Sequence, residues 1–286
     1  MMEEDFTEIL GSNTVRLSKG QRVIAQYILD NIEKAAFMTA GALGSAVNVS
    51  ESTVVRFAAK LGYDGYPGMQ KALQEKIRNS LTSVQRMDAA KSIIKEDNIL
   101  RKVLHTNIDE IKATMELASE EEFNSCVDML INAERIYILG LRSSSAVAGF
   151  LYYYMNLLFD DVTLLENDIF GELFGKLIRL GENDVMIAAS FPRYSSQTLR
   201  VAQFAKQQNA KLIALTDSIR SPLSSIADRR LIASNKMISF VDSLVGSMSL
   251  ATALIVAISQ KKEGELSQTF RRLESVWAEN LIYENN

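Results

Sequence analysis

The chain has 286 residues, of which 47% are hydrophobic, so it can bury the core of one large domain or of two ordinary ones. A net charge of −4 and a pI near 5.3 argue against a protein that is coated in nucleic acid over its whole surface. The single cysteine, Cys126, excludes an intramolecular disulfide and a cysteine-based metal site, and its apolar periodic surroundings predict a buried thiol.

The charge is uneven along the chain. Residues 16–91 contain eleven basic and six acidic residues, a local net charge of +5, which leaves −9 for the rest. A basic N-terminal region followed by an acidic remainder fits an N-terminal DNA-binding domain, although a chance fluctuation of surface charge gives the same count. The acidic start has no basic segment before an apolar run, so we expect no signal peptide. The most apolar stretch, 240–258, is interrupted by Asp242 and serines, which favours a buried helix over a membrane span and a cytoplasmic location.

The first region, residues 17–77, has apolar residues at helical spacing with short breaks. Ser18 is the expected N-cap of a helix that ends near Asn31, and a second helix follows Thr39. A third helix is predicted over Glu51–Leu61, with Ser50 as its N-cap and Gly62 as its stop signal. The apolar residues expected to pack this helix onto its neighbours are Val54, Val55, Phe57, Ala58 and Leu61.

Two short helices around a tight turn fit a helix-turn-helix motif, in which the start of the second helix faces base edges in the major groove. Arginine is the commonest reader of guanine, and Ser or Thr can reach bases or phosphates. The candidates for base contacts are Glu51, Ser52, Thr53 and Arg56, and those for contacts with the DNA backbone are Ser50, Lys60 and Tyr63. A purely structural three-helix bundle shows the same helix pattern.

The segment VSESTVVRF (49–57), followed by KLGYDGY (60–66) and preceded by Leu17-Ser18 and IAQYI (24–28), resembles the N-terminal domain of the RpiR family of transcription regulators. The resemblance continues into the second half and covers most of the chain. It implies that a double-stranded DNA operator is a partner.

The second region alternates short β-branched runs with helical stretches, which predicts a parallel sheet covered on both faces. The predicted strands are Arg135–Leu139, Val162–Leu165, Val185–Ala189, Lys211–Leu215 and Arg230–Ile232. The predicted helices between them are Ala146–Leu158, Ile169–Leu180, Thr198–Gln208 and a short one near Leu223–Ala227. The fold class is therefore α/β: an all-α helix-turn-helix domain (1–77), a polar linker helix (78–104) and a five-stranded parallel α/β domain (105–286).

The last predicted helix, Val241–Gln260, is apolar nearly all round, so we expect it to lie in a core or an oligomer interface. Helix-turn-helix proteins usually read paired half-sites. Both observations predict a homodimer or homotetramer.

Two hydroxyl-rich loops, each with an arginine, follow predicted strands: Gly140–Ser145 and Ser190–Ser195. Ligands of parallel sheets bind beyond the C-terminal strand ends, where helix N-termini favour anions. The candidate ligand-binding residues are Arg142, Ser143, Ser144, Ser145, Ser190, Arg193 and Ser195. The alternative is that these serines only cap the following helices.

This half resembles the SIS (sugar isomerase) domain that RpiR regulators carry, which implies a phosphorylated sugar as effector. The first family loop commonly runs Gly-x-Gly-x-Ser; here Arg142 stands at the second glycine and Ser144 at the serine. In the second loop, commonly Ser-x-Ser-Gly-x-Thr, Pro192 and Arg193 replace the inner Ser-Gly. Residues 221–228 also resemble the family, and we interpret them as structural.

We expect no catalysis, cofactor or metal. Sugar isomerisation needs a positioned acid and base, yet the only histidine, His105, lies upstream of the sheet, and Glu166 and Asp217 follow strands without a specific motif. Two alternatives stay open: a sugar-phosphate isomerase with a helical appendage, and a sugar-binding protein that acts on protein partners.

Overall fold

The computed structural model describes residues 17–77, 81–87, 98–166 and 170–280. The chain divides into two compact units, residues 1–93 and 94–286. Helix α8 (Ile99–Leu117) runs across position 105 and packs on α13 (Val245–Lys261) of the second unit. Part of the predicted linker lies outside the described residues, so the boundaries at 77 and 105 stay predictions.

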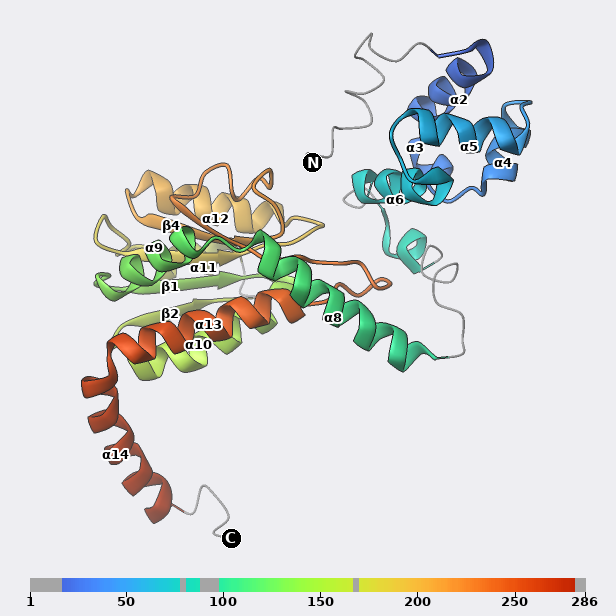
Figure 1. Ribbon diagram of the computed structural model, residues 1–286. Helices are drawn as coiled ribbons and strands as arrows, with labels where there is room; N and C mark the ends of the chain where they lie inside the picture. Colours follow the sequence, from blue (N-terminus) through green and yellow to red (C-terminus); the bar gives the residue numbers. More distant parts are fainter. Residues whose placement is uncertain (1–16, 78–80, 88–97, 167–169, 281–286) are drawn as a thin grey trace. The chain divides into compact units, whose positions relative to one another are not determined.

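The first unit is helical (Figure 1), with elements α2 (Lys19–Asp30), α3 (Ile32–Ala35), α4 (Ala40–Ala46), α5 (Glu51–Lys60) and α6 (Gly65–Ile77). Ser18 and Gln21 form a capping box at the start of α2, and the side chains of Thr39 and Ser50 cap α4 and α5. The three predicted helices are therefore confirmed. Their core includes the fully buried side chains of Ile24, Ile28, Leu43 and Phe57.

Val55 is a correction to the predicted core. Val54, Phe57 and Ala58 share the buried face of α5, whereas the Val55 side chain is 40% exposed. At about 100° per residue, Val55 points away from the face that its neighbour Val54 buries. Its methyl groups therefore lie on the outer side of the helix.

The second unit contains a five-stranded sheet, all parallel, in the order β2-β1-β3-β4-β5. The strands are β1 (Ile136–Gly140), β2 (Val162–Leu165), β3 (Val185–Ala189), β4 (Lys211–Thr216) and β5 (Arg229–Ile232). All five predicted strands are confirmed to within one residue at each end. The order places β1, β3 and β4 side by side in the middle of the sheet.

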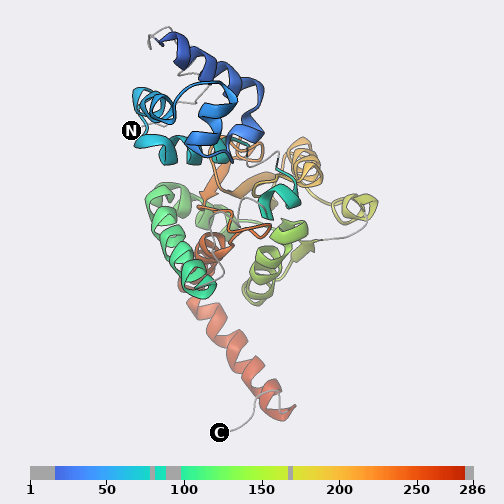
Figure 2. The same ribbon diagram turned by 90° about the vertical axis from the view of Figure 1, so that its right-hand side faces the viewer.

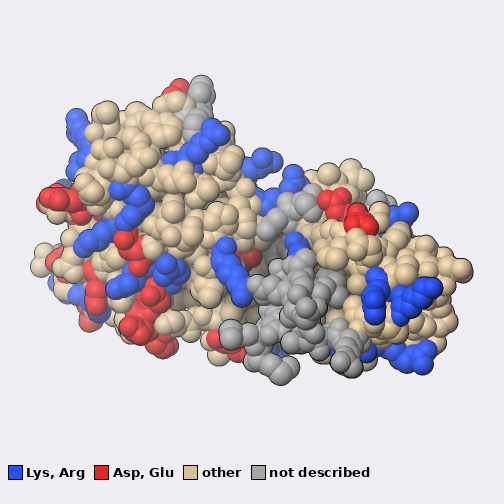
Figure 3. Space-filling model, turned by 90° about the horizontal axis from the view of Figure 1, so that it is seen from above, with Lys and Arg blue, Asp and Glu red and all other residues tan. Residues whose placement is uncertain are grey.

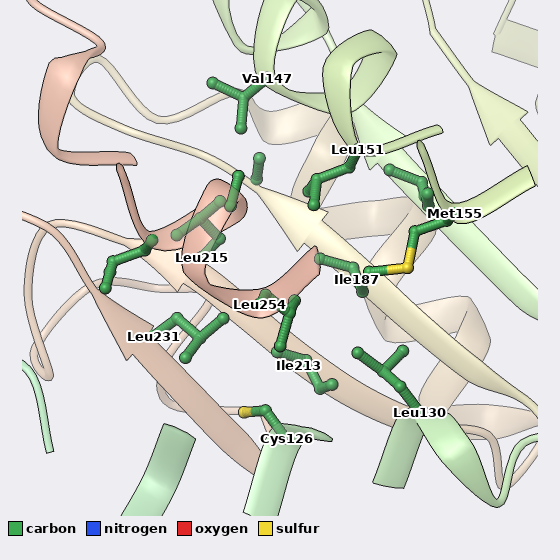
Figure 4. Packing of buried hydrophobic residues seen from close by; sticks show 14 of the residues in the cluster. Cys126, Leu130, Val147, Leu151, Met155, Ile187, Ile213, Leu215, Leu231 and Leu254 are labelled. Atoms are coloured by element: carbon green, nitrogen blue, oxygen red, sulfur yellow. The ribbon is translucent and has the colours of Figure 1, made fainter. Parts of the chain in front are cut away.

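Helices cover both faces of this sheet. On one face, α9 (Glu120–Ile131), α10 (Ser145–Leu158) and α13 pack on alternate strand residues such as Ile187 and Ile213 (Figure 4). On the other, α11 (Phe170–Lys176) and α12 (Ser196–Gln207) cover the intervening residues, such as Met186 and Leu212. Cys126 lies in the first core, as predicted, and burial raises the pKa of its thiol to about 12. The result is a three-layer α/β/α unit.

Several predicted helix limits are wrong. The segment near Leu223–Ala227 forms hydrogen-bonded turns instead of a helix, and α11 ends at Lys176, not at Leu180. Helix α13 begins at Val245 because the chain before it forms a bridge between Met237 and Asp242.

Helix α14 (Glu263–Glu279) is not predicted by the sequence patterns considered above. It extends away from the sheet (Figures 1 and 2) and has no buried residue. None of the described helices combines the length and the apolar character that a membrane crossing requires.

Candidate DNA-binding and ligand-binding sites

The turn between α4 and α5 is tight because two residues permit it. A Cβ atom on Gly44 would lie 2.7 Å from the carbonyl oxygen of Val49, so only glycine lets the turn approach α4 this closely. Asn48 has a φ of 55°, the left-handed conformation that asparagine tolerates better than most residues. This turn brings Ser50 to the start of α5.

The first turn of α5 presents an exposed hydroxyl cluster. The Ser50 hydroxyl accepts from the Thr53 backbone N–H at 3.3 Å and lies within 2.9 Å of the Ser52 hydroxyl and 2.8 Å of the Thr53 hydroxyl. One turn further on, the exposed Arg56 donates from Nε to the Ser52 carbonyl at 3.2 Å. The outer side of the helix thus carries a group of four predicted contact residues: Ser50, Ser52, Thr53 and Arg56.

A hollow of about 590 Å³ lies where the starts of α2 and α5 approach each other. Its lining residues are Ser18, Gly20, Gln21, Val49, Ser50, Thr53 and Arg56. The partial positive charge of two helix N-termini and the guanidinium of Arg56 favour an anion in this hollow. The contribution of α2 was not predicted from the sequence, although the capping pair Ser18 and Gln21 marks the start of this helix.

The other three predicted DNA contacts occupy different surroundings. A carboxylate oxygen of Glu51 lies 3.3 Å from the place of a Cβ on Gly41, against the first turn of α4, where the helix dipole favours negative charge. Lys60 is exposed at the end of α5. Tyr63 is half-buried and follows Gly62, whose φ of 88° ends the helix. Figure 3 shows basic side chains on the surface of this unit.

In the second unit, the strand register brings the two predicted loops together. Gly140 at the end of β1 pairs with Ala189 at the end of β3, so the two loops start side by side at the C-terminal edge of the sheet. The Ser190 backbone N–H donates to the Leu215 carbonyl at 3.1 Å, which ties the second loop to β4. The predicted meeting of both loops at one edge is confirmed at their starting residues.

The first loop is sharply folded. A Cβ atom on Gly140 would lie 2.5 Å from the Ser144 carbonyl oxygen and 2.6 Å from the Ala148 Cβ, so glycine is required there. Arg142 has a φ of 58°, in the left-handed region that glycine adopts without strain. The Ser145 hydroxyl donates to the Arg142 carbonyl at 2.7 Å, while Ser143 is exposed.

The second loop ends in a helix cap. The Ser195 hydroxyl accepts from the Thr198 backbone N–H at 3.2 Å and begins α12. The Tyr194 hydroxyl donates to Oδ1 of Asp217 at 2.9 Å, which connects this loop to the one after β4. Arg193 is exposed. Tyr194 and Asp217 were not predicted as site residues, because a hydrogen bond across 23 positions leaves no local sequence pattern.

The capping alternative accounts for only part of the hydroxyl set. Ser195 caps α12, and Ser145 bonds within its own loop. Ser144 and Ser190 are both buried, at 6% and 5% exposure, and neither hydroxyl makes a hydrogen bond to another described residue. Both hydroxyls are therefore able to donate to a bound group with oxygen acceptors.

Residues 221–228 form hydrogen bonds among themselves and with neighbouring elements, which supports their interpretation as structural. The Ser221 hydroxyl accepts from the Ser224 backbone N–H at 3.1 Å, and Asp228 binds Lys206 Nζ and the Leu212 backbone N–H, each at 2.7 Å. In the part of the chain that the structure describes, no three His, Cys, Asp or Glu side chains gather as a metal site would require. His105 is exposed on α8, a helix that precedes the sheet in the chain.

These features define a class of protein: a helix-turn-helix unit joined to a parallel α/β unit with polar loops at its C-terminal edge. Family models match both units, a helix-turn-helix domain of the rpiR family over residues 5–80 and a SIS domain over residues 129–257. The chain belongs to the RpiR family of transcriptional regulators.

Relatives that align with most of this chain are named as regulators. The chain is 25% identical over 286 residues to an uncharacterized HTH-type transcriptional regulator of Haemophilus influenzae, covering 96% of each chain. It is 26% identical over 229 residues to the HTH-type transcriptional regulator HexR of Escherichia coli, covering 77% of this chain and 74% of that protein.

Two solved structures share the fold. The sugar isomerase domain of an RpiR transcription factor from Sphaerobacter thermophilus matches with a TM-score of 0.60 and 26% identity, covering 63% of this chain and 99% of that one. The NanR protein of Vibrio vulnificus, complexed with ManNAc-6P, matches with a TM-score of 0.59 and 22% identity, covering 99% of this chain and all of that one.

Proposed function

We propose that this regulator binds a DNA operator through α5 and controls genes of carbohydrate metabolism in response to a phosphorylated sugar. The observation that carries the effector site is the pairing of Gly140 with Ala189, which starts two hydroxyl loops side by side. The buried residues Ser144 and Ser190 lie in those loops. NanR, which has the same fold, is complexed with a phosphorylated sugar, and this supports the choice of ligand class.

For DNA recognition, we assign base contacts to the exposed start of α5 and a phosphate contact to the hollow between α2 and α5. Arg56 can donate two parallel hydrogen bonds to guanine from its place on the outer side of the helix. The exposed Val55 can contact a thymine methyl group. Ser50, Lys60 and Tyr63 are assigned to the DNA backbone, whereas Glu51 is a weaker candidate because it lies against α4.

For the effector, we assign the phosphate to the loops at the C-terminal edge of the sheet. Ser144 and Ser190 are the central candidates, and Ser143, Ser145 and Ser195 are the further hydroxyl candidates of the same two loops. Arg142 and Arg193 supply positive charge in place of the glycine and the Ser-Gly pair of the family loops.

We propose that the chain is not an enzyme. The alternative, a sugar-phosphate isomerase, needs an acid and a base near the bound sugar, and the exposed His105 on α8 does not follow any strand of the sheet. The names of relatives that align with most of this chain also support a regulator. A steady conversion of a sugar phosphate by the purified protein would establish the alternative.

We further propose a homodimer or homotetramer in the cytoplasm. One face of α13 is buried against α8, α10 and the sheet, but Val256 on its other side is 49% exposed. An operator with paired half-sites requires two helix-turn-helix units. Light scattering at micromolar concentration should show at least two copies; a stable monomer would contradict this proposal.

A thermal-shift series with phosphorylated sugars tests the effector. A ligand that binds only the folded state at 100 times its Kd adds about 2.7 kcal/mol to the free energy of unfolding. We expect one phosphorylated sugar to raise the Tm of the wild type and to leave that of Ser144→Ala unchanged. Ser267→Ala on the exposed α14 is the matched control and should respond like the wild type. A panel with no effect on the wild type would remove sugar phosphates as effectors.

A further inference from the structure

Helix α8 has a wider apolar arc than its own unit covers. Its inner face packs on the rest of the second unit. The Thr114 hydroxyl accepts from the Ser234 backbone N–H at 3.0 Å, and the Asn107 side-chain oxygen accepts from the Ser243 hydroxyl at 2.9 Å. A second apolar row lies outside this face and is exposed. Its members are Leu100, Leu104, Ile108, Ile111 and Met115, here called the α8 stripe.

The α8 stripe has the geometry of a helix-pairing seam. Its members follow one another at spacings of four, four, three and four residues, which keeps them within one narrow row. At about 100° per residue, the row lies about a quarter of a turn from the inner face and a similar angle from the charged face. Leu100 and Met115, at its two ends, are 72% and 74% exposed. Figure 1 shows that α8 reaches past the end of α13.

The charges of α8 indicate what covers this stripe. Arg101 and Lys102 lie in the first turn and Glu116 in the last turn, and the first turn has no acidic residue and the last no basic one. A helix dipole favours anions at the start of the helix and cations at its end. The charges at both ends of α8 are therefore of the unfavourable sign for their own helix. An antiparallel copy of the same helix places each basic start beside an acidic end, and it also opposes the two dipoles. A parallel copy would place like charges together.

We propose that α8 pairs antiparallel with α8 of a second copy of this chain through the α8 stripe. This inference rests on the oligomer proposed above and names one of its contact surfaces. A two-fold axis near Ile108 pairs Leu100 with Met115 and Leu104 with Ile111 across the interface. The helix is about 28 Å long, so one helix pair buries less surface area than a standard interface does. The α8 pair therefore adds to other contacts between the copies.

Disulfide trapping of the full-length protein tests both the pairing and its direction. Ile108→Cys lies near the axis, so mild oxidation should give a covalent dimer on a non-reducing gel. Leu100→Cys alone should not cross-link, because its two copies would lie about 20 Å apart. A mixture of the Leu100→Cys and Met115→Cys proteins should form the mixed dimer. The native Cys126 is buried, so the wild type is the background control.

Asp109→Cys is the matched control, since it lies one residue from Ile108 on the exposed charged face and should stay monomeric on the gel. Strong cross-linking of Leu100→Cys alone would overturn the antiparallel direction. If light scattering shows a dimer while Ile108→Cys does not cross-link, the α8 pair is wrong and the oligomer stands. A monomeric wild type would overturn both the α8 pair and the oligomer. The effector and DNA-binding sites do not depend on this result.

Discussion

Arg142 replaces a glycine of the family loop, yet its backbone keeps the left-handed conformation that this glycine adopts. Its φ of 58° is the conformation for which the family loop uses glycine. The left-handed region costs a residue with a Cβ about 1–2 kcal/mol. The loop therefore retains a strained turn and gains a cation two residues before the buried Ser144.

Comparison of Arg142→Gly with Arg142→Ala isolates this strain, because both variants lose the guanidinium. We expect the glycine variant to be more stable than the alanine variant by up to about 1 kcal/mol, after the greater chain entropy of glycine is included. Urea unfolding monitored by circular dichroism measures the difference. Equal stability of the two variants would show that the backbone at this position is not strained.

Arg56 is the residue on which the DNA assignment depends most. If it reads a base, Arg56→Ala should weaken operator binding by about 1–3 kcal/mol and relax the preference at one base pair. Lys60→Ala should instead weaken binding to all sequences alike and flatten its salt dependence. Fluorescence anisotropy at several salt concentrations separates the two. Unchanged operator affinity in a folded Arg56→Ala protein would remove this residue from the recognition surface.

At the scale of elements, the sequence predicted what depends on local periodicity and missed what depends on distant contacts. Strands such as Val185–Ala189 were predictable because β-branched runs stand between turn signals. The hydrogen bond from Tyr194 to Asp217 joins residues far apart in the chain, so no local pattern indicates it. The exposure of Val55 was predictable, because it follows from the rotation of about 100° between Val54 and Val55 on α5. Helix α14 was missed, and it packs too little to bury any residue.

The junction of β1 with α10 depends on a glycine that the sequence alone marked only as part of a loop. Gly140→Ala would place a methyl group 2.5 Å from the Ser144 carbonyl oxygen, so the loop must move, at a cost of about 1–3 kcal/mol. Gly149→Ala, inside α10, meets no atom within 4 Å and should stabilise the protein by about 0.5–1 kcal/mol. Denaturant unfolding of both variants checks the opposite signs; a neutral Gly140→Ala would mean that the loop yields easily.

At the scale of the whole molecule, function requires that the ligand unit influence the DNA unit. A bound effector can change operator affinity only if it binds one state of the protein more tightly than another. A coupling of about 1–3 kcal/mol, a 5- to 150-fold change in affinity, is the usual size of such an effect. Two copies joined through their second units would let the effector change how two helix-turn-helix units meet paired half-sites.

Ser144 and Ser190 separate sensing from DNA binding. Ser144→Ala and Ser190→Ala should abolish the effect of the sugar phosphate on operator affinity, because each removes a buried hydroxyl beside the proposed phosphate. Operator affinity without ligand should stay close to that of the wild type, since the first unit is unchanged. Anisotropy titrations with and without ligand, at one fixed salt concentration, measure both quantities. Ser267→Ala should keep the full response. If both site variants also kept it, the effector would bind elsewhere; if they lost ligand-free DNA binding, the two hydroxyls would serve the fold.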